Sequence, residues 1–222
     1  MPKQKTKRLH PEAVLFDMDG VIVDSMPYHF LAWYEALREF NCSVTSFDVY
    51  EHEGEPWNTT LPKFLDKNHK AYDAKLVRKI FDYRQKIFKR IFKRYIFHGA
   101  EHVLTTLHSR GMRLALVSGT PAKDIQRILP KYLYKLFEVI VGGDEVQHGK
   151  PHPEPYLTAA KKLGVSPKNC VVVENAPLGI RSAKAAKMTC IAIPTSLPPV
   201  YLKNAKADIV IERIADLEGV LI

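Results

Sequence analysis

The sequence predicts an α/β protein whose core is a doubly wound, mostly parallel sheet, with an all-helical module inserted after the first strand. Three observations support this fold class. Short apolar runs that are typical of buried parallel strands recur along the chain and alternate with segments of helical periodicity. Acidic or polar residues directly follow several of these runs. Helical periodicities, without a convincing strand, fill residues 27–97.

The first strand is expected at residues 13–17, where an apolar run ends in an aspartate. Similar runs occur at residues 113–117, 137–141, 170–173 and 189–193. Helical patterns separate them at residues 98–110, 121–129, 153–163 and 177–187. This alternation of strand and helix predicts a Rossmann-like sheet.

Two longer helices are expected in the first half of the chain, at residues 29–40 and 74–95. The buried side of the second one is predicted from its spaced apolar residues, namely Ile80, Tyr83 (or Phe81), Ile87 and Ile91. We therefore divide the chain into a core domain, residues 1–25 and 98–222, and a helical cap domain, residues 26–97. An insert at this point would lie over the carboxyl edge of the sheet and act as a lid.

The net charge of +9 is concentrated in one segment. Residues 62–95 contain 12 Lys or Arg and three Asp. Such a segment could steer an anionic substrate or bind a phosphate backbone, whereas the simpler interpretation is the solvated face of an amphipathic helix. The apolar side of this helix is expected to be buried, so its aromatic residues would not stack on bases, and no nucleic-acid partner is expected.

The composition is that of an ordinary soluble globular protein, with 46% hydrophobic and 26% charged residues. The three cysteines are scattered, which argues against a disulfide framework and favours a reducing compartment. The basic N-terminal segment lacks the apolar stretch of a signal peptide, and no run is long enough to span a membrane. We expect a cytoplasmic protein with no membrane partner, as a monomer or a weak dimer.

The strongest chemical signal is the run Asp-Met-Asp-Gly-Val-Ile-Val-Asp-Ser at residues 17–25. Two carboxylates, Asp17 and Asp19, at the end of a buried strand are costly unless something compensates for their charge. A hard divalent cation with oxygen ligands is the natural compensation, and Gly20 permits the tight turn that lets both side chains converge. The alternative is an acidic turn that faces solvent.

Polar residues also follow other predicted strands, namely Ser118, Asp144 and Glu174. Because open parallel sheets bind ligands outside the carboxyl ends of their strands, these residues are candidates for the same site as Asp17.

Four motifs in order resemble those of the haloacid dehalogenase superfamily, in particular its members with a helical cap after the first strand. The first motif is the run at residues 17–25. The others are Val-Ser-Gly-Thr at residues 117–120, Lys-Pro-His-Pro-Glu-Pro-Tyr at 150–156 and Val-Glu-Asn-Ala-Pro-Leu-Gly-Ile at 173–180. The resemblance extends from Val14 to about Val210.

The resemblance implies a phosphomonoester hydrolase that works through an aspartyl-phosphate. Asp17 would be the nucleophile, which splits one difficult step into two. Asp19 would protonate the leaving oxygen and then activate water. Ser118 and Lys150 would hold and neutralise the phosphoryl oxygens.

The resemblance also implies that Mg²⁺ is the cofactor. The metal would lie between the Asp17 carboxylate, the Asp19 main-chain carbonyl and the fourth motif. That motif departs from the commonest family form, which has two adjacent acids, because Asn175 follows Glu174. An amide oxygen brings no charge, so we expect somewhat weaker metal binding. Either Glu174 or Asn175 could contact the metal directly.

The expected substrate is a small phosphorylated metabolite, such as a sugar phosphate. Gly119 and Thr120 of the second motif are candidate substrate-binding residues. In the cap, residues 28–33 resemble the sugar phosphomutases, which implies that His29 and Trp33 face the closed site. Trp57 could stack on a substrate. All three cap side chains could instead pack within the protein.

A β-phosphoglucomutase-like phosphomutase is the alternative activity. The resembling mutases hold a second phosphate with an arginine after a cap glycine and with a lysine and an asparagine after the second motif. Here Trp57 stands where the arginine is expected, and Pro121 and Ala122 follow the second motif. We therefore expect hydrolysis. A non-catalytic protein that binds anions or nucleic acid through the basic cap helix is the alternative of another class.

Overall fold

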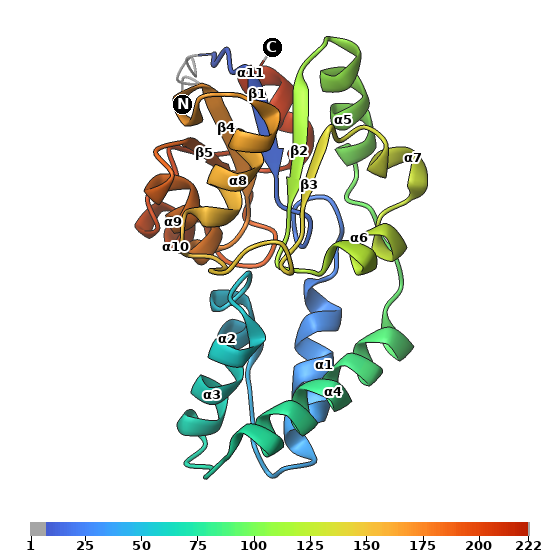
Figure 1. Cartoon of the computed structure of the whole chain (residues 1–222), viewed down its shortest axis with the longest axis vertical. Coiled ribbons are helices and arrows are strands. Elements are labelled where there is room, and N and C mark those ends of the chain that lie inside the picture. Colours follow the sequence, from blue (N-terminus) through green and yellow to red (C-terminus); the bar gives the residue numbers. More distant parts are fainter. Residues whose placement is uncertain (1–7, 222) are drawn as a thin grey trace.

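Six parallel strands form one sheet with the order β3-β2-β1-β4-β5-β6 (Figure 1). The computed structural model describes residues 8–221, so residues 1–7 and 222 of the predicted core domain lie outside the described part. The strands are β1 (Ala13–Phe16), β2 (Arg113–Val117), β3 (Val139–Val141), β4 (Cys170–Glu174), β5 (Thr189–Ala192) and β6 (Ile209–Val210). The predicted α/β class with a parallel sheet is confirmed.

The order of the strands reverses direction at β1. The chain adds β2 and β3 on one side of β1 and then returns to add β4, β5 and β6 on the other side. Phe16 at the end of β1 is level with Leu116 of β2 and Val173 of β4. The residues that follow these three strands therefore meet at the switch point of the sheet, where open α/β folds bind ligands.

Helices cover both faces of the sheet (Figure 1). One face packs against α5 (Ala100–Ser109), α6 (Ala122–Ile128), α7 (Lys131–Tyr134), the 3₁₀ turn η2 (Ile214–Leu217) and α11 (Glu218–Leu221). The other face packs against α8 (Glu154–Leu163), α9 (Pro177–Ala185) and α10 (Pro199–Asn204), and the 3₁₀ turn η1 (Pro167–Asn169) leads into β4. Alternate residues of β1 belong to the two apolar clusters, with Val14 in the first and Leu15 in the second. A strand that is buried on both faces needs the unbroken apolar run seen in the sequence.

Four helices lie beyond the carboxyl ends of the strands (Figure 1). These are α1 (Met26–Arg38), α2 (Ser46–Glu51), α3 (Trp57–Lys67) and α4 (Ala74–Ile91), which we call the cap. The longest pair, α1 and α4, pack along each other, and α4 buries Val77, Ile80, Ile87 and Phe88. Most of the basic side chains of α4 are exposed, as expected for an amphipathic helix.

The two chain segments that connect the cap to the core run side by side. Val23 forms an antiparallel bridge with Ile96. The Asp24 amide donates to the Tyr95 carbonyl at 2.9 Å, and the Phe97 amide donates to the Ile22 carbonyl at 3.0 Å. The entry and exit of the cap are therefore joined by backbone hydrogen bonds.

Two details of the helical prediction were wrong. The helix expected to reach residue 95 ends at Ile91, because Phe92 is already extended. Of the two aromatic residues offered for the buried side, Tyr83 is 38% exposed and Phe81 is half-buried against the core cluster, and Arg84 is buried on that side. With 3.6 residues per turn, the buried positions 77, 80, 84, 87 and 88 lie on one side of the helix, and position 83 lies outside that side.

Two short cap helices, α2 and α3, were not identified individually from the sequence, and neither was the two-residue strand β6. The start of α2 carries a local signal. Thr45 and Asp48 form a reciprocal capping box, in which the Thr45 side chain accepts from the Asp48 amide and the Asp48 side chain accepts from the Thr45 amide. Among the described helices, none combines the length and the apolar content that a membrane crossing requires.

Leu15→Ala is expected to lower the free energy of unfolding by about 2–5 kcal/mol, because it leaves a cavity in the middle of the sheet. Leu15 has no exposed surface, whereas Leu31 on α1 is 44% exposed and provides a matched control. Urea unfolding of both variants measures the difference. Equal losses in Leu15→Ala and Leu31→Ala would contradict the assigned core.

Candidate active site

Polar residues from three adjacent strands meet at the carboxyl edge of the sheet. Asp17 follows β1, Ser118 follows β2 and Glu174 ends β4, and all three side chains are buried. The parallel register explains this convergence, since Phe16 at the end of β1 is level with Leu116 and Val173, each one residue before the end of its strand. Lys150 reaches the same place from the loop between β3 and α8, and it too is buried.

The Lys150 ammonium group links two carboxylates. Its Nζ donates to Asp17 Oδ1 at 2.5 Å and to Glu174 Oε1 at 2.7 Å. Although burial disfavours the charged form, these two carboxylates raise the pKa of Lys150 above its usual value. Lys150 is therefore a permanently charged partner of both acids.

Both carboxylate oxygens of Glu174 are already occupied. Oε1 accepts from Lys150 and from the Tyr156 hydroxyl at 2.8 Å. Oε2 accepts from the backbone amides of Asn175 at 2.8 Å and Ala176 at 3.0 Å. Tyr156, which sequence reasoning did not single out, lies in the first turn of α8. This arrangement makes Glu174 an anchor for Lys150.

Asn175 is fully buried and has one free oxygen. Its Nδ2 donates to Glu53 Oε2 at 3.0 Å and to Ser196 Oγ at 3.1 Å. Its Oδ1 has no hydrogen-bond partner among the described residues. Gly20 lies directly against this amide, at a φ of +79°, and a Cβ atom at Gly20 would overlap the Asn175 side chain. The glycine is therefore needed both for its backbone conformation and for this close approach.

A second buried oxygen, Asp17 Oδ2, also lacks a partner in the described part of the chain. Burial raises the pKa of Asp17 well above its usual value; Lys150 opposes this rise, and the charges of Glu174 and Asp19 reinforce it. The carboxylates at this edge thus carry more negative charge than Lys150 alone balances. Two unpartnered oxygens beside an excess of negative charge fit a hard divalent cation such as Mg²⁺.

Asp19 lies among four hydrogen-bonding groups. Its Oδ1 accepts from Ser25 Oγ at 2.6 Å and lies 3.4 Å from His29 Nε2. Its Oδ2 accepts from Ser118 Oγ at 3.2 Å and Thr120 Oγ1 at 3.3 Å. Burial opposes ionisation, but the hydrogen bonds from His29, Ser25 and Ser118 lower the pKa of Asp19. The second motif therefore contacts Asp19 directly through two hydroxyl groups.

His29 connects Asp19 to a buried arginine of the cap. Arg84 Nη2 donates to His29 Nδ1. Because a guanidinium group can only donate, the neutral imidazole carries its proton on Nε2, the nitrogen that faces Asp19. Burial lowers the pKa of His29, with a contribution from the charge of Arg84, although Asp19 opposes it.

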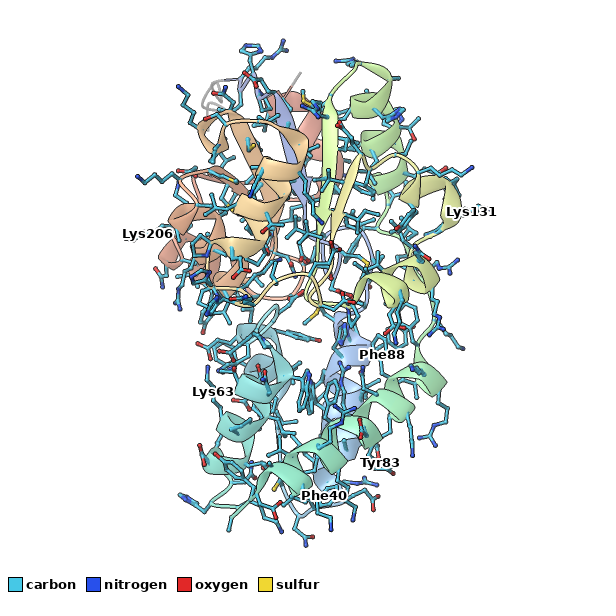
Figure 2. All side chains as sticks on the ribbon, viewed as in Figure 1. Phe40, Lys63, Tyr83, Phe88, Lys131 and Lys206 are labelled. Carbon is cyan, nitrogen blue, oxygen red and sulfur yellow. The ribbon has the colours of Figure 1, made fainter. Side chains whose placement is uncertain are left out.

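The Arg84 guanidinium group is enclosed by aromatic rings. It lies 5.1 Å from the ring centroid of Trp33 and 5.0 Å from that of Phe88. Burial lowers the pKa of Arg84 to about 10. Figure 2 places Phe88 on the part of the cap nearest the core. Sequence reasoning missed Arg84, and the signal that could have found it is its position in the buried stripe of α4.

The turn between α2 and α3 lies at the end of the cap nearest the carboxyl edge of the sheet (Figure 1). Gly54 in this turn has a φ of +82°, and a Cβ atom there would lie 2.8 Å from Lys150 Cδ. A Cβ atom on Gly149 would likewise lie 2.8 Å from the Pro56 ring. Phe47 of α2 also packs edge-on against Tyr201 of α10, with ring centroids 5.2 Å apart. The cap is thus in contact with the core over the site.

Glu53, which precedes this glycine, was not identified as a site residue from the sequence. Its Oε1 is buried and unpartnered among the described residues. Burial, together with the charges of Asp17 and Glu174, raises the pKa of Glu53 well above its usual value. The cap therefore adds a further acidic group to the site.

The remaining predicted site residues lie in different surroundings. Gly119 lies against the carbonyl oxygen of Gly54, which is 3.6 Å from where a Cβ atom would be. Trp57 begins α3 and stacks on Phe81 of α4, with ring centroids 4.0 Å apart and an interplanar angle of 13°. Trp57 therefore packs within the cap, which was the alternative to stacking on a substrate.

Within residues 8–221, His148, His152 and Glu154 form the one group of three or more His, Cys, Asp or Glu side chains whose ligand atoms lie within 4.8 Å of one another. Local hydrogen bonds account for these contacts. Glu154 accepts from the backbone amides of Gln147 and His148, and His152 Nδ1 accepts from the Glu154 amide at 3.2 Å. Their ligand atoms are therefore engaged at the start of α8.

Comparison with known proteins gives consistent matches over most of the chain. A family model described as haloacid dehalogenase-like hydrolase matches residues 14–193. A phosphorylated carbohydrates phosphatase from Thermotoga maritima is 32% identical over 182 residues, which cover 79% of this chain and 81% of that protein. The β-phosphoglucomutase of Bacillus subtilis is 31% identical over 219 residues, which cover 93% and 91%. The crystal structure of β-phosphoglucomutase from Clostridium difficile has a TM-score of 0.82 and 26% identity and covers 93% of each chain.

Lys150→Met is expected to lower the free energy of unfolding by about 3–5 kcal/mol, because it leaves the buried carboxylates of Asp17 and Glu174 without their cation. Adding Asp17→Asn to this variant should recover part of the loss. Lys162→Met, which removes an exposed pair with Glu145, serves as the control and should have little effect. Urea unfolding measures all three, and equal losses for the two lysines would contradict the buried-pair assignment.

Proposed function

This chain belongs to the haloacid dehalogenase-like hydrolase family, and we propose that it is a Mg²⁺-dependent phosphatase that cleaves a small phosphomonoester through an aspartyl-phosphate. The observation that carries the proposal is the Asp17 carboxylate, which Lys150 holds by one oxygen while the other oxygen is buried and unpartnered. Asp19, a second acid with a different environment, lies beside it.

Asp17 would act as the nucleophile. Lys150 favours its ionised form and lies where it would also neutralise charge on a phosphoryl oxygen. Ser118, Gly119 and Thr120 follow β2 and would bind the remaining phosphoryl oxygens, since phosphoryl transfer depends chiefly on positioning and electrostatic stabilisation. The P–O bond of the ester breaks as the carboxylate–phosphorus bond forms.

Asp19 would move the proton in both steps. In the first step its carboxylic acid protonates the leaving alkoxide, and in the second the resulting carboxylate takes a proton from the water that attacks the aspartyl-phosphate. The second step therefore restores the proton used in the first. The hydrogen bonds from His29, Ser25 and Ser118 stabilise the ionised form that the second step requires.

The metal would be held by Asp17 Oδ2, the Asp19 main-chain carbonyl and Asn175 Oδ1. When bound there, Mg²⁺ would neutralise charge that develops on the transferring phosphoryl group. Glu174 would act through Lys150 and not as a direct ligand, because its two oxygens already accept four hydrogen bonds.

Sugar phosphates are the substrate class that we propose. The relatives described above are named a phosphorylated carbohydrates phosphatase and a β-phosphoglucomutase. Hydrolysis is favoured over a mutase reaction by the groups at the positions where a second phosphate would be held. Trp57 is stacked within the cap, Pro121 precedes α6, and the Ala122 amide donates to Asp144 Oδ1 at 2.8 Å.

The exposed basic residues of α4 do not form part of this site. Several of them line a surface depression of about 720 Å³, together with Phe40 and Tyr83. Figure 2 places these two residues at the end of the cap away from the core. The acids Glu39 and Asp82 also line the depression, so its charge is mixed. This surface gives no support to the non-catalytic alternative.

We expect Mg²⁺-dependent release of p-nitrophenol from p-nitrophenyl phosphate, and a loss of at least about a thousandfold in Asp17→Asn because the nucleophile is removed. Chelation with EDTA should abolish turnover, and added Mg²⁺ should restore it. Phosphate release from a panel of sugar phosphates would identify the substrate. Conversion of β-glucose 1-phosphate to glucose 6-phosphate with a bisphosphate activator, without phosphate release, would instead establish the mutase.

Asp19→Asn is expected to give a burst of about one p-nitrophenol per enzyme followed by slow turnover. The p-nitrophenolate leaving group needs no proton, so the first step continues, whereas activation of water is slowed by roughly 100-fold or more. An alkyl phosphate, whose leaving group needs the proton, should show no burst. Rapid-mixing kinetics with the two substrates make the comparison, and the same profile for both would argue against the assigned role.

A further inference from the structure

We propose that Glu53 of the cap orients the Asn175 amide so that its oxygen faces the metal, and that the metal site is complete only when the cap contacts the core. The inference rests on the metal site proposed above. Its basis is the 3.0 Å contact between Asn175 Nδ2 and Glu53 Oε2, which joins the fourth motif of the core to the turn between α2 and α3.

An asparagine poses a problem that an aspartate does not. Either oxygen of a carboxylate can bind a cation, so rotation about its last bond has no consequence. An amide has one oxygen and one NH₂ group, and rotation by half a turn would present donor hydrogens to the metal. Because Asn175 is fully buried, the protein must favour one of these two orientations through its partners.

Of the two partners of Asn175 Nδ2, only one can select the orientation. Ser196 Oγ can donate or accept, so it would satisfy either end of the amide. Glu53 Oε2 accepts from this NH₂ group at 3.0 Å, and a carboxylate has no hydrogen to donate, so in that form Glu53 requires the NH₂ group to face it. The other end of the amide, Oδ1, is then buried and has no hydrogen-bond partner among the described residues. An oxygen that is to bind a metal must be free in this way before the metal arrives.

The two partners also belong to different parts of the molecule. Asn175 follows β4 of the core, whereas Glu53 lies in the cap turn whose next residue, Gly54, packs against the Lys150 side chain. Moving this turn away from the core would remove the acceptor that orients the amide. Cap contact and metal binding therefore favour each other, and by linkage each strengthens the other by the same factor.

The test is the dissociation constant of Mg²⁺ alone, measured by calorimetry and checked with Mn²⁺ by electron paramagnetic resonance. Glu53→Ala is expected to weaken binding about tenfold, the size of one hydrogen bond to a charged group. Glu53→Met, which keeps the side-chain volume without a comparable acceptor, should behave in the same way. Glu51→Ala, two residues earlier and exposed, is the matched control and should bind as the unsubstituted chain does.

Repeating the substitution in the Asn175→Asp background separates orientation from simple charge attraction. A carboxylate at 175 needs no orientation, so Glu53→Ala should no longer weaken Mg²⁺ binding there and should strengthen it if the two acids repel. Equal weakening in both backgrounds, or no weakening in either, would overturn the inference while leaving the phosphatase intact. Absence of Mg²⁺ binding by the unsubstituted chain would overturn the proposed metal site as well. Circular dichroism and thermal midpoints check that each variant is folded.

Discussion

The site depends on one buried ammonium group. Lys150 is enclosed at the switch point of the sheet, where it pairs with Asp17 after β1 and Glu174 at the end of β4. Tyr156 and two backbone amides hold Glu174, and so fix the position of the lysine. A buried charge is tolerated only with such partners, because desolvation would otherwise exceed the attraction. The position of the Asp17 carboxylate is therefore set by Lys150 and by the groups that hold Glu174.

The same constraint explains why the cap contains so many polar groups near the core. Asp19 receives one set of hydrogen bonds from the core and another from His29, which Arg84 supports from within the cap. Glu53 extends from the opposite side of the cap to Asn175. Each half of the molecule thus supplies hydrogen-bonding groups that the other half needs.

The sheet and the residues at its edge could be predicted from the sequence because both follow from local patterns. An apolar run that ends in an acid predicts Asp17 without any knowledge of its neighbours, and the same holds for Ser118 and Glu174. The family resemblance placed Lys150. These predictions needed only the strand period and the rule that parallel strands end at a common edge.

The missed residues depend on partners far away in the sequence. Arg84 lies in a segment where basic residues are frequent, and its burial follows from the rings of Trp33 and Phe88 and from the imidazole of His29, mostly on another helix. Glu53 lies in a turn without periodicity. Its proposed role depends on the side-chain amide of Asn175, which is 122 residues later in the sequence. No local pattern distinguishes these two side chains from ordinary surface charges.

The paired connections between cap and core have a mechanical consequence. Since the Asp24 and Tyr95 backbones are hydrogen-bonded to each other, the two connections share one hinge axis instead of bending separately. A rotation about this axis moves each cap residue in proportion to its distance from it. His29, in the first turn of α1, is displaced little, whereas the tip that carries Glu53 travels through a wider arc. A slight swing would thus break the link to Asn175 first and leave His29 beside Asp19 nearly in place.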